Sequence, residues 1–488
     1  MSTDPTIVVV VALYMGALLY LGWLACRRTR TCEDFYLAGR SLGSWITAIS
    51  STASSESGWV VLGAVGMVYA GGVSALWFAP GCLLGYLINL YWLAPRLRRE
   101  AARQGSLTLP DFLADRFGDP RHVIRIAAVT VILLSLGGYL AAQMTATGKA
   151  MDSILNVGYV PGILIGGAII IVYTLLGGFT AVSFTDFFQG LIMVISLVVM
   201  PVLVLVEAGG YEGLLSRLAA IDPDLVSITG GKEGFALFGF IAGLVGIGLG
   251  YPGQPHVITR YMAAASDEKI RQTQLIAICW GVLVFYGAGF LGLGGRLIMP
   301  ELAAGGDPEK LFPLLSRSML HPLLAGVMLA AILSAIMSTV SSQLLVCASA
   351  VSRDIIGKIL GKTQDDRLAV RAGRITVAVL GLAAIGVAIG EVRVVFWFVL
   401  FAWSGLGAAF GPVLLLSLST KLLSRAGVVA GMLTGFGVTV IWKFTGLSDS
   451  IIYELVPAFF GAALVSVAVS LIGRRTSPPA APAGTASS

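Results

Sequence analysis

AISSTASSESGW, at residues 48–59, interrupts a stretch that is otherwise long and apolar enough to cross a bilayer. A second segment, GIGLGYPGQP at 246–255, interrupts another apolar stretch at the corresponding place in the other half of the chain. Lipid cannot satisfy free backbone N–H and C=O groups, so an unwound segment at membrane depth must face protein, water or ligand. Broken helices at matching positions of two repeats indicate the binding site of a carrier.

The composition places the chain in a membrane. Of 488 residues, 57% are hydrophobic and only 12% are charged, whereas a soluble domain carries about 25% charged residues. A membrane helix needs about 20 mostly apolar residues. We therefore expect an all-α integral membrane protein with thirteen spans, at residues 6–26, 43–70, 74–95, 122–150, 159–177, 180–206, 234–254, 272–298, 320–350, 372–391, 394–419, 426–446 and 451–473.

The basic residues indicate which loops face the cytoplasm. If the N-terminus is outside, the cytoplasmic segments and their edges hold most of the 32 Lys and Arg, as the positive-inside rule requires. These segments are 27–42, 96–121, 255–271, 351–371, 420–425 and 474 onward. The net charge of +6 is then a topology signal, and we expect no nucleic-acid partner.

The two breaks also suggest an internal repeat. When the first span and the last two are set aside, two sets of five remain, and an odd number makes the second set enter the bilayer inverted. The first helix of each set is the broken one. The expected divisions are an extra helix and loop at 1–42, a first repeat at 43–206, an extracellular loop at 207–233, an inverted repeat at 234–420, two C-terminal helices at 421–475 and a disordered tail at 476–488.

The first break is rich in oxygen atoms. STASSESGW, at 51–59, holds five hydroxyl side chains and one carboxyl. Ser57 and Gly58 would open the outer half-helix, whose free N–H groups suit a carboxylate. The freed carbonyls before the break suit a hard cation. The alternative is that the hydroxyls only cap a kinked helix.

A second hydroxyl-rich segment, AILSAIMSTVSSQLL at 331–345, offers a partner. Ala335 lies three residues before Ser338 and four before Thr339, so the three share one helix face. One carbonyl and two hydroxyls would converge there without any charge. Small hydroxyl faces also mediate helix packing, which is the structural alternative.

Acids at membrane depth are functional candidates. Glu56 lies in the first break. Asp186 lies near the cytoplasmic start of its helix, where solvation at the interface is the alternative. Glu454 lies near an outer helix end, where a structural role is favoured.

Other functions lack their signatures in the sequence. An enzyme would need a nucleophile–base pair or a metal constellation. A channel would need a continuous polar path across its spans, and a sensor would need an attached signalling domain. The five cysteines and three histidines have no metal-site spacing, so we expect no transition-metal site and no cofactor. GLGYPG at 248–253 matches a dinucleotide fingerprint only literally, because that fingerprint requires a soluble βαβ unit.

Six segments carry a family resemblance: FYLAGRSLGSWITAIS at 35–50, SGW at 57–59, LTLPDFLADRF at 107–117, GLGYPGQPHVITRYMAA at 248–264, AIMSTVSSQLLVCASA at 335–350 and WSGLGAAFGPV at 403–413. Together they resemble the sodium/solute symporter family, closest to its bacterial sodium/proline symporter branch, over about residues 5 to 473. The resemblance implies secondary active transport in the bacterial cytoplasmic (inner) membrane. A small amino acid, most favourably proline, would enter with Na⁺ by alternating access.

The resemblance also implies site residues. Na⁺ would bind the carbonyls of Ala53, Glu56 and Ala335 and the hydroxyls of Ser338 and Thr339. Asp186 matches an acid associated with cation passage. The residues that match the substrate region are Ser57, Gly58, Trp59, Tyr139, Ile247, Tyr251 and Pro255.

Two departures from the proline branch concern this site. The branch reads Ala-Ser-Asp-hydrophobic-Ser-Gly-Trp, whereas this chain has Ser55 and then Glu56. Glu56 would either stand in for the displaced Asp at Na⁺ or carry a coupling proton; the hydroxyls at 338–339 favour the first. The branch also has a Trp where this chain has Ile247, which changes pocket volume and stacking. A proton-coupled or uncoupled carrier of another small amino acid or carboxylate is therefore the alternative function.

Overall fold

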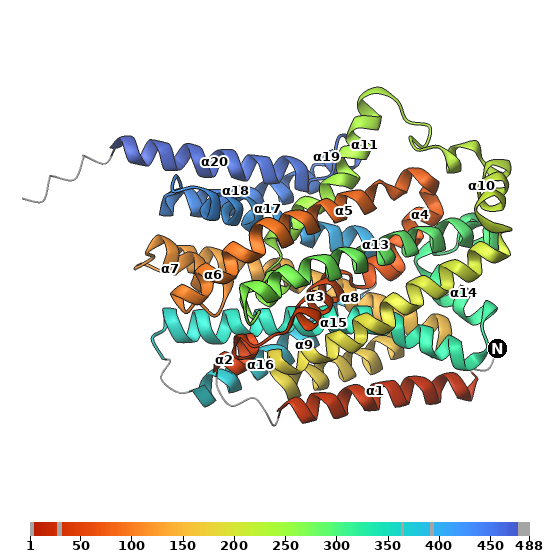
Figure 1. The fold of residues 1–488 in the computed structure, drawn as a ribbon, viewed down its shortest axis with the longest axis horizontal. Coiled ribbons are helices and arrows are strands. Elements are labelled where there is room, and N and C mark those ends of the chain that lie inside the picture. The colour runs from red at the N-terminus through yellow and green to blue at the C-terminus, as the bar shows by residue number, and fades with distance from the viewer. Residues whose placement is uncertain (1–3, 27–31, 363–365, 391–394, 477–488) are drawn as a thin grey trace, which may run out of the picture.

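A computed structural model describes residues 4–26, 32–362, 366–390 and 395–476. Helices packed along one common axis make up the molecule (Figure 1). The described residues contain no β-strand; their only strand-like pairing is an isolated parallel bridge between Leu42 and Ala264. The all-α prediction is confirmed for these residues.

The α-helices follow the apolar stretches of the sequence. Their bounds are α1 (Pro5–Cys26), α2 (Cys32–Leu37), α3 (Ser44–Ser55), α4 (Val65–Gly71), α5 (Phe78–Leu87), α6 (Ala94–Gln104), α7 (Leu109–Phe117), α8 (Val123–Leu155), α9 (Tyr159–Glu207), α10 (Gly210–Ile221), α11 (Gly234–Gly246), α12 (Pro255–Met262), α13 (Asp267–Ile298), α14 (Leu311–Met319), α15 (Pro322–Ser349), α16 (Asp366–Ile389), α17 (Val395–Ser419), α18 (Arg425–Phe444), α19 (Leu447–Ser450) and α20 (Leu455–Thr476). Shorter 3₁₀ or π segments include η2 (Trp59–Ala64), η6 (Ile247–Gly253) and η9 (Ala350–Ile359).

Eleven helices of the described part are long and apolar enough to cross a membrane. The sequence predicted thirteen spans, and the two numbers differ for local reasons. Trp59–Gln104 is one such stretch and covers parts of two predicted spans. Tyr159–Leu175, where another span was predicted, is apolar but shorter. It leads into a kink of α9 at Gly178, whose φ of 59° lies in the left-handed region.

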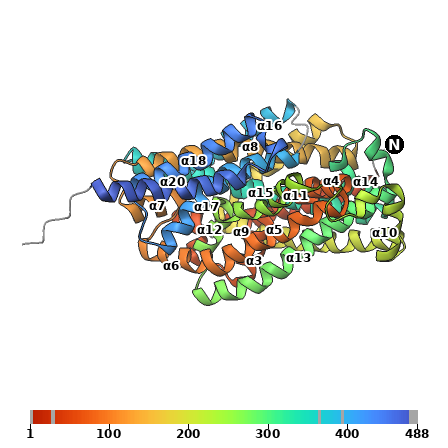
Figure 2. The ribbon, with the colours of Figure 1, turned by 90° about the horizontal axis from the view of Figure 1, so that it is seen from above.

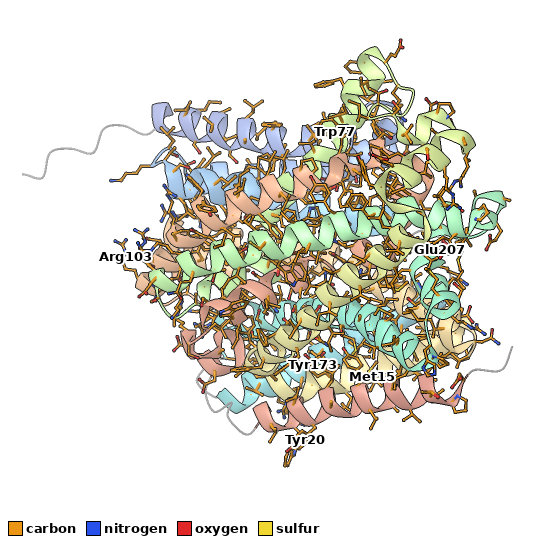
Figure 3. All side chains as sticks on the ribbon, turned by 45° about the vertical axis from the view of Figure 1, so that its right-hand side comes forward. Met15, Tyr20, Trp77, Arg103, Tyr173 and Glu207 are labelled. Atoms are coloured by element: carbon orange, nitrogen blue, oxygen red, sulfur yellow. The ribbon has the colours of Figure 1, made fainter. Side chains whose placement is uncertain are left out.

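Loops that were predicted to face opposite sides of the membrane lie at opposite ends of the bundle. Figure 3 shows Arg103 of α6 at one end and Glu207 of α9 at the other. Figure 1 shows the same separation for the start of α1 and the end of α20. In Figure 3, Tyr20 of α1 points away from the bundle, whereas Tyr173 is fully buried.

The first broken helix is interrupted over a shorter stretch than the sequence indicated. Residues 48–55 remain helical, and several of their hydroxyls bond back to carbonyls of the same helix, as Thr52 does to Ala48 at 2.9 Å. Regular helix ends at Ser55, and Glu56 has non-helical dihedral angles of −99° and 58°. A helical path resumes with Gly58 as the N-cap of η2. Only Glu56 and Ser57 are unwound.

The second broken helix unwinds over a longer segment. α11 is followed by η6 and then by Gln254, whose dihedral angles of −90° and 103° are extended. Pro252 and Pro255 each lack an N–H for a helical bond. Gly248 is required by packing, because a Cβ there would lie 1.9 Å from the carbonyl oxygen of Gly81 on α5.

The segment after the second break differs from its prediction. Residues 255–271 were expected to form a cytoplasmic loop, but 255–262 form α12, and all eight residues of this helix are buried. Pro255 at N1 is pre-organised for a helix start, and burial of the whole segment stabilises the helix although Val257, Ile258 and Thr259 are β-branched. The end of α12 is tied to Leu42, two residues before α3, because Leu42 N–H donates to Ala263 O at 3.1 Å and Ala265 N–H donates to Leu42 O at 3.0 Å.

The centre of the bundle contains α15. Figure 2 shows α13 and α16 at opposite edges with α15 between them. α15 packs against α3, α8, α9 and α12. This packing brings its hydroxyl-rich segment next to the first break.

Candidate functional site

Two hydroxyls of α15 meet carbonyls of α3 directly before the first break. Ser338 Oγ donates to Ala53 O at 3.0 Å and to Ala335 O at 3.1 Å. Thr339 Oγ1 donates to Ser54 O at 2.9 Å and to Ala335 O at 3.3 Å. All five residues are buried. The structure therefore brings together four of the five residues predicted for Na⁺, and it adds the carbonyl of Ser54.

The oxygen atoms in this cluster are neutral. Carbonyls at the C-terminal end of a half-helix, where Ala53 and Ser54 lie, coordinate Na⁺ in transporters with broken helices. Hydroxyl oxygens also suit a hard cation, which prefers oxygen ligands. A hydroxyl keeps a lone pair for a cation when its proton turns to another acceptor. This set of neutral oxygen ligands fits a monovalent cation.

Glu56 was predicted to offer its backbone carbonyl to Na⁺, and its side chain to stand in for the displaced Asp; the carboxylate points away from Ser338 and Thr339. Oε1 accepts hydrogen bonds from Tyr86 at 2.7 Å, from Tyr251 at 2.9 Å and from Ser55 at 3.0 Å. Within the described residues, none of its hydrogen bonds goes to Ser338 or Thr339. Tyr86 is a site residue that sequence reasoning missed, because nothing in the span 74–95 distinguishes it from packing tyrosines.

Ser57 and Gly58 meet α8 across the break. The hydroxyl of Ser57 lies 3.2 Å from that of Tyr139, and Gly58 N–H donates to Gln143 Oε1 at 3.0 Å. The N–H groups predicted to be free are thus already paired, since Trp59 N–H also donates to Ser57 Oγ at 3.3 Å. Gln143 was missed, although a lone amide in the apolar span 122–150 was an available signal.

Aromatic rings close the region around the break. Trp59 is buried among Phe78, Phe285 and Phe396, and its Nε1–H donates to Ser55 O at 2.9 Å. The ring of Tyr251 makes edge contacts with Tyr86 and Trp403, at 5.0 and 4.8 Å between centroids.

Ile247 and Pro255 lie farther along the second broken helix. Ile247 lines a cavity of about 600 Å³ that opens near Asp222, Lys232 and Tyr453. Its carbonyl accepts from Trp403 Nε1 at 3.1 Å. Pro255 instead lines a narrow cavity of about 20 Å³ together with Phe35. The structure therefore groups Ser57, Gly58, Trp59, Tyr139 and Tyr251 with Glu56, but places Ile247 and Pro255 toward opposite cavities.

Asp186 is buried inside the bundle and is paired with a base. Its Oδ2 accepts from Ser50 at 2.7 Å, from Ser54 at 3.2 Å and from Arg260 Nη2 at 3.0 Å. Interfacial solvation is therefore not its environment. Arg260 was missed because its segment was assigned to a loop, and it also bonds Ser342 of α15.

Helices that break at two matching places, around buried oxygens and aromatic rings, define a membrane carrier. Residues 35–435 match the Sodium:solute symporter family. The High-affinity proline transporter PutP of Bacillus subtilis (strain 168) is 37% identical over 92% of this chain and 94% of its own. The Sodium/proline symporter of Escherichia coli (strain K12) is 36% identical over 98% of this chain and 95% of its own. The chain belongs to the sodium:solute symporter family, as the sequence motifs predicted, and is a transporter and not an enzyme.

The fold has a counterpart among solved structures. A Na⁺-coupled sialic acid symporter, in a substrate-bound outward-open state, superimposes with a TM-score of 0.80. The alignment covers 96% of this chain and 98% of that one at 18% identity. This likeness concerns the fold alone.

Proposed function

We propose that this protein is a secondary active transporter that couples the uptake of a small amino acid, most favourably proline, to the sodium gradient. The observation that carries the proposal is the convergence of the Ser338 and Thr339 hydroxyls on carbonyls of Ala53, Ser54 and Ala335 beside the first break. The names of the proline-transporting relatives support the choice of substrate.

The ion site consists of the carbonyls of Ala53, Glu56 and Ala335 with the hydroxyls of Ser338 and Thr339. Na⁺ supplies the positive charge that binds with the substrate and makes uptake follow the sodium gradient. The chain's residues supply neutral oxygens from two helices, α3 and α15, so that the site is complete only when these helices are together. Asp186 is linked to this site through Ser54, whose hydroxyl donates to Asp186 and whose carbonyl accepts from Thr339, and it contributes to cation passage.

The substrate region consists of Ser57, Gly58, Trp59, Tyr139 and Tyr251, with Ile247 and Pro255 on the paths to either side. Its arrangement supports alternating access. Ile247 lines the larger cavity together with Asp222 and Lys232, which lie in the loop that we assign to the outside. Pro255 lines the narrower one together with Leu107, which lies in a segment that we assign to the cytoplasm.

The finer topology is part of the same proposal. Thirteen spans form an extra helix (1–42), two inverted five-helix repeats (43–206 and 234–420) separated by an outer loop, and two C-terminal helices (421–475). The N-terminus is outside and the C-terminus is in the cytoplasm, in the bacterial cytoplasmic membrane. The opposite placement of Arg103 and Glu207 supports this arrangement (Figure 3).

Uptake of radiolabelled amino acids into proteoliposomes tests the function. We expect proline to accumulate when Na⁺ is higher outside, and to equilibrate without accumulation when the sodium gradient is collapsed. A panel of small amino acids and carboxylates identifies another substrate if proline is not transported. Accumulation driven by a pH gradient in sodium-free buffer would instead establish the proton-coupled alternative, for which the buried Glu56 is the candidate.

A further inference from the structure

Glu56 differs from most buried acids of this protein in having no basic partner. In the described part of the chain, four buried acids do have a basic partner: Asp186 pairs with Arg260, Asp111 and Asp354 both pair with Arg125, and Glu309 pairs with Lys149. No ion pair of Glu56 or Glu454 occurs among these described residues. An unpaired carboxylate in a low-dielectric interior is costly unless a cation joins it.

One oxygen of this carboxylate is left open. Oε1 accepts three hydroxyl hydrogen bonds, from Ser55, Tyr86 and Tyr251, which fix the orientation of the side chain. Oε2 is buried and has no hydrogen-bond partner. A fixed carboxylate with one bare oxygen is ready to accept a hydrogen bond from a cationic donor.

An open donor lies across the same break. Gln143 Oε1 accepts from Gly58 N–H at 3.0 Å. This bond sets the orientation of the amide, since a backbone N–H needs the oxygen and not the nitrogen. Gln143 Nε2 is then buried without a partner. The break therefore has one unused acceptor with negative charge, on Glu56, and one unused donor, on Gln143 of α8, which is bonded to Gly58 two residues after Glu56.

We propose that this pair recognises the zwitterion of an α-amino acid. Glu56 Oε2 accepts from the substrate's ammonium group, and Gln143 Nε2 donates to its carboxylate, beside the N-terminus of η2. The inference rests on the proposed function and assigns residues to the two charged groups of its substrate, an amine and a carboxylate attached to the same carbon.

The direction of the Glu56 side chain favours an ammonium group over Na⁺. Its hydrogen bonds lead to Tyr86 on α5 and Tyr251 on η6, whereas the neutral oxygens suited to Na⁺ come from α3 and α15. A primary or secondary ammonium group needs few acceptors arranged around its N–H bonds, and one charged oxygen supplies the strongest of them. The displaced acid of this chain thereby gains a role separate from the ion.

Competition against radiolabelled proline in proteoliposomes tests the inference. The probes are L-proline, cyclopentanecarboxylate, which lacks the amine, and pyrrolidine, which lacks the carboxylate. In wild type, L-proline should compete better than either probe by about 10- to 100-fold, as expected for a charge-assisted hydrogen bond. Glu56→Gln should remove the advantage over cyclopentanecarboxylate and keep that over pyrrolidine, and Gln143→Leu should give the reverse pattern.

The sodium concentration for half-maximal uptake is measured in parallel and should stay within about twofold in Glu56→Gln, because the substitution keeps the backbone carbonyl of Glu56 and leaves the other oxygens of the ion site unchanged. Glu454→Gln is the matched control: Glu454 is also buried and accepts a serine hydroxyl, from Ser404 at 3.3 Å. It should behave as wild type toward all three probes. If Glu56→Gln is not recovered as a monodisperse protein, Glu56→Asp, which keeps the charge on a shorter side chain, should show a partial loss of discrimination.

Two results would overturn the inference. One is that Glu56→Gln discriminates between proline and cyclopentanecarboxylate as well as wild type does. The other is that Glu56→Gln changes the sodium concentration for half-maximal uptake and leaves the competition by all three probes unchanged. If wild type transports a different amino acid, the same comparison is made with that amino acid and its deaminated analogue, so the choice of proline fails while the inference stands. Transport of a solute without an amine would refute both.

Discussion

The hydroxyl of Thr339 donates to the carbonyl of Ser54 at 2.9 Å, which joins two residues 285 positions apart in the chain. Ser54 lies two residues before the unwound Glu56, and Thr339 lies in the middle of α15. The bond therefore connects the intact helix α15 to α3, which ends at the first break. Its donor is also one of the oxygens that we assign to Na⁺.

Replacing Thr339 by Ala should weaken sodium binding without disrupting the fold. The change removes one hydroxyl oxygen from the site and leaves the helix-forming backbone intact. We expect the sodium concentration for half-maximal uptake to rise at least several-fold, measured as uptake against Na⁺ at fixed proline. Thr174→Ala is the control, because Thr174 is also buried but bonds only the carbonyl of Ile170 in its own helix, at 2.8 Å. An unchanged sodium requirement in Thr339→Ala would remove this residue from the ion site.

The Asp186–Arg260 pair should show strong coupling in stability. Both side chains are fully buried, at 3.0 Å from each other. Removing one partner leaves a buried unpaired charge, which costs about 3–5 kcal/mol, whereas removing both avoids that cost. Arg260→Met alone should therefore lower the thermal unfolding temperature in detergent more than Arg260→Met combined with Asp186→Asn. Additive effects of the two substitutions would show that the pair does not act as a unit.

Glycines at close helix contacts should not accept a methyl group. A Cβ on Gly248 would lie 1.9 Å from Gly81 O, so Gly248→Ala must separate η6 from α5. We expect a sharp fall in folded yield and in uptake. Gly137→Ala makes the same chemical change on α8, where a Cβ would meet nothing within 4 Å. This control should be neutral or more stable, because alanine favours a helix by about 0.5–1 kcal/mol over glycine. Equal behaviour of the two variants would contradict the close approach.

An ion cluster at one end of the bundle should respond to acid. Burial raises the pKa of Asp111 on α7, but Arg353 and Arg125 outweigh that effect and hold the pKa below its ordinary value of 3.8. A lowered pKa in the folded state stabilises the protein above the ordinary pKa, and this stabilisation is lost as the pH falls through the folded value. Asp111→Asn should therefore lower the unfolding temperature at pH 7, and the difference from wild type should shrink below about pH 4. A difference that does not depend on pH would mean that the ionised form of Asp111 has no special role.

Local patterns in the sequence were enough to predict the hydroxyl and carbonyl cluster that the structure brings together. The spacing of Ala335, Ser338 and Thr339 is a property of one helix, and the break at Glu56 was predicted from a segment rich in hydroxyl side chains with little apolar periodicity. The extent of that break was overestimated, because hydroxyls such as that of Thr52 bond back within the helix and preserve it. Composition alone does not reveal which way a serine or threonine hydroxyl turns.

Partners from distant parts of the chain were harder to predict. Gln143 and Tyr86 lie 85 and 30 positions from the groups that they contact at the break, and only tertiary packing brings them there. Arg260 was misplaced because α12 is a short buried helix of eight residues, too short for a hydropathy window to identify. The charge of Arg260 then suggested a loop, although Asp186 neutralises it inside the bundle.

The helices α3 and α12 are joined at two places, and this has a mechanical consequence. Leu42 exchanges backbone hydrogen bonds with Ala263 and Ala265, so the start of α3 is fastened to the end of α12. Deeper in the bundle, Arg260 Nε donates to Ser50 Oγ at 3.0 Å. Two attachment points prevent one rod from rotating independently of the other. A force applied to α12 is therefore transmitted to α3, and the two helices move together as one rigid unit. The bending of this unit is concentrated in the short unwound segments at Glu56–Ser57 and Gln254.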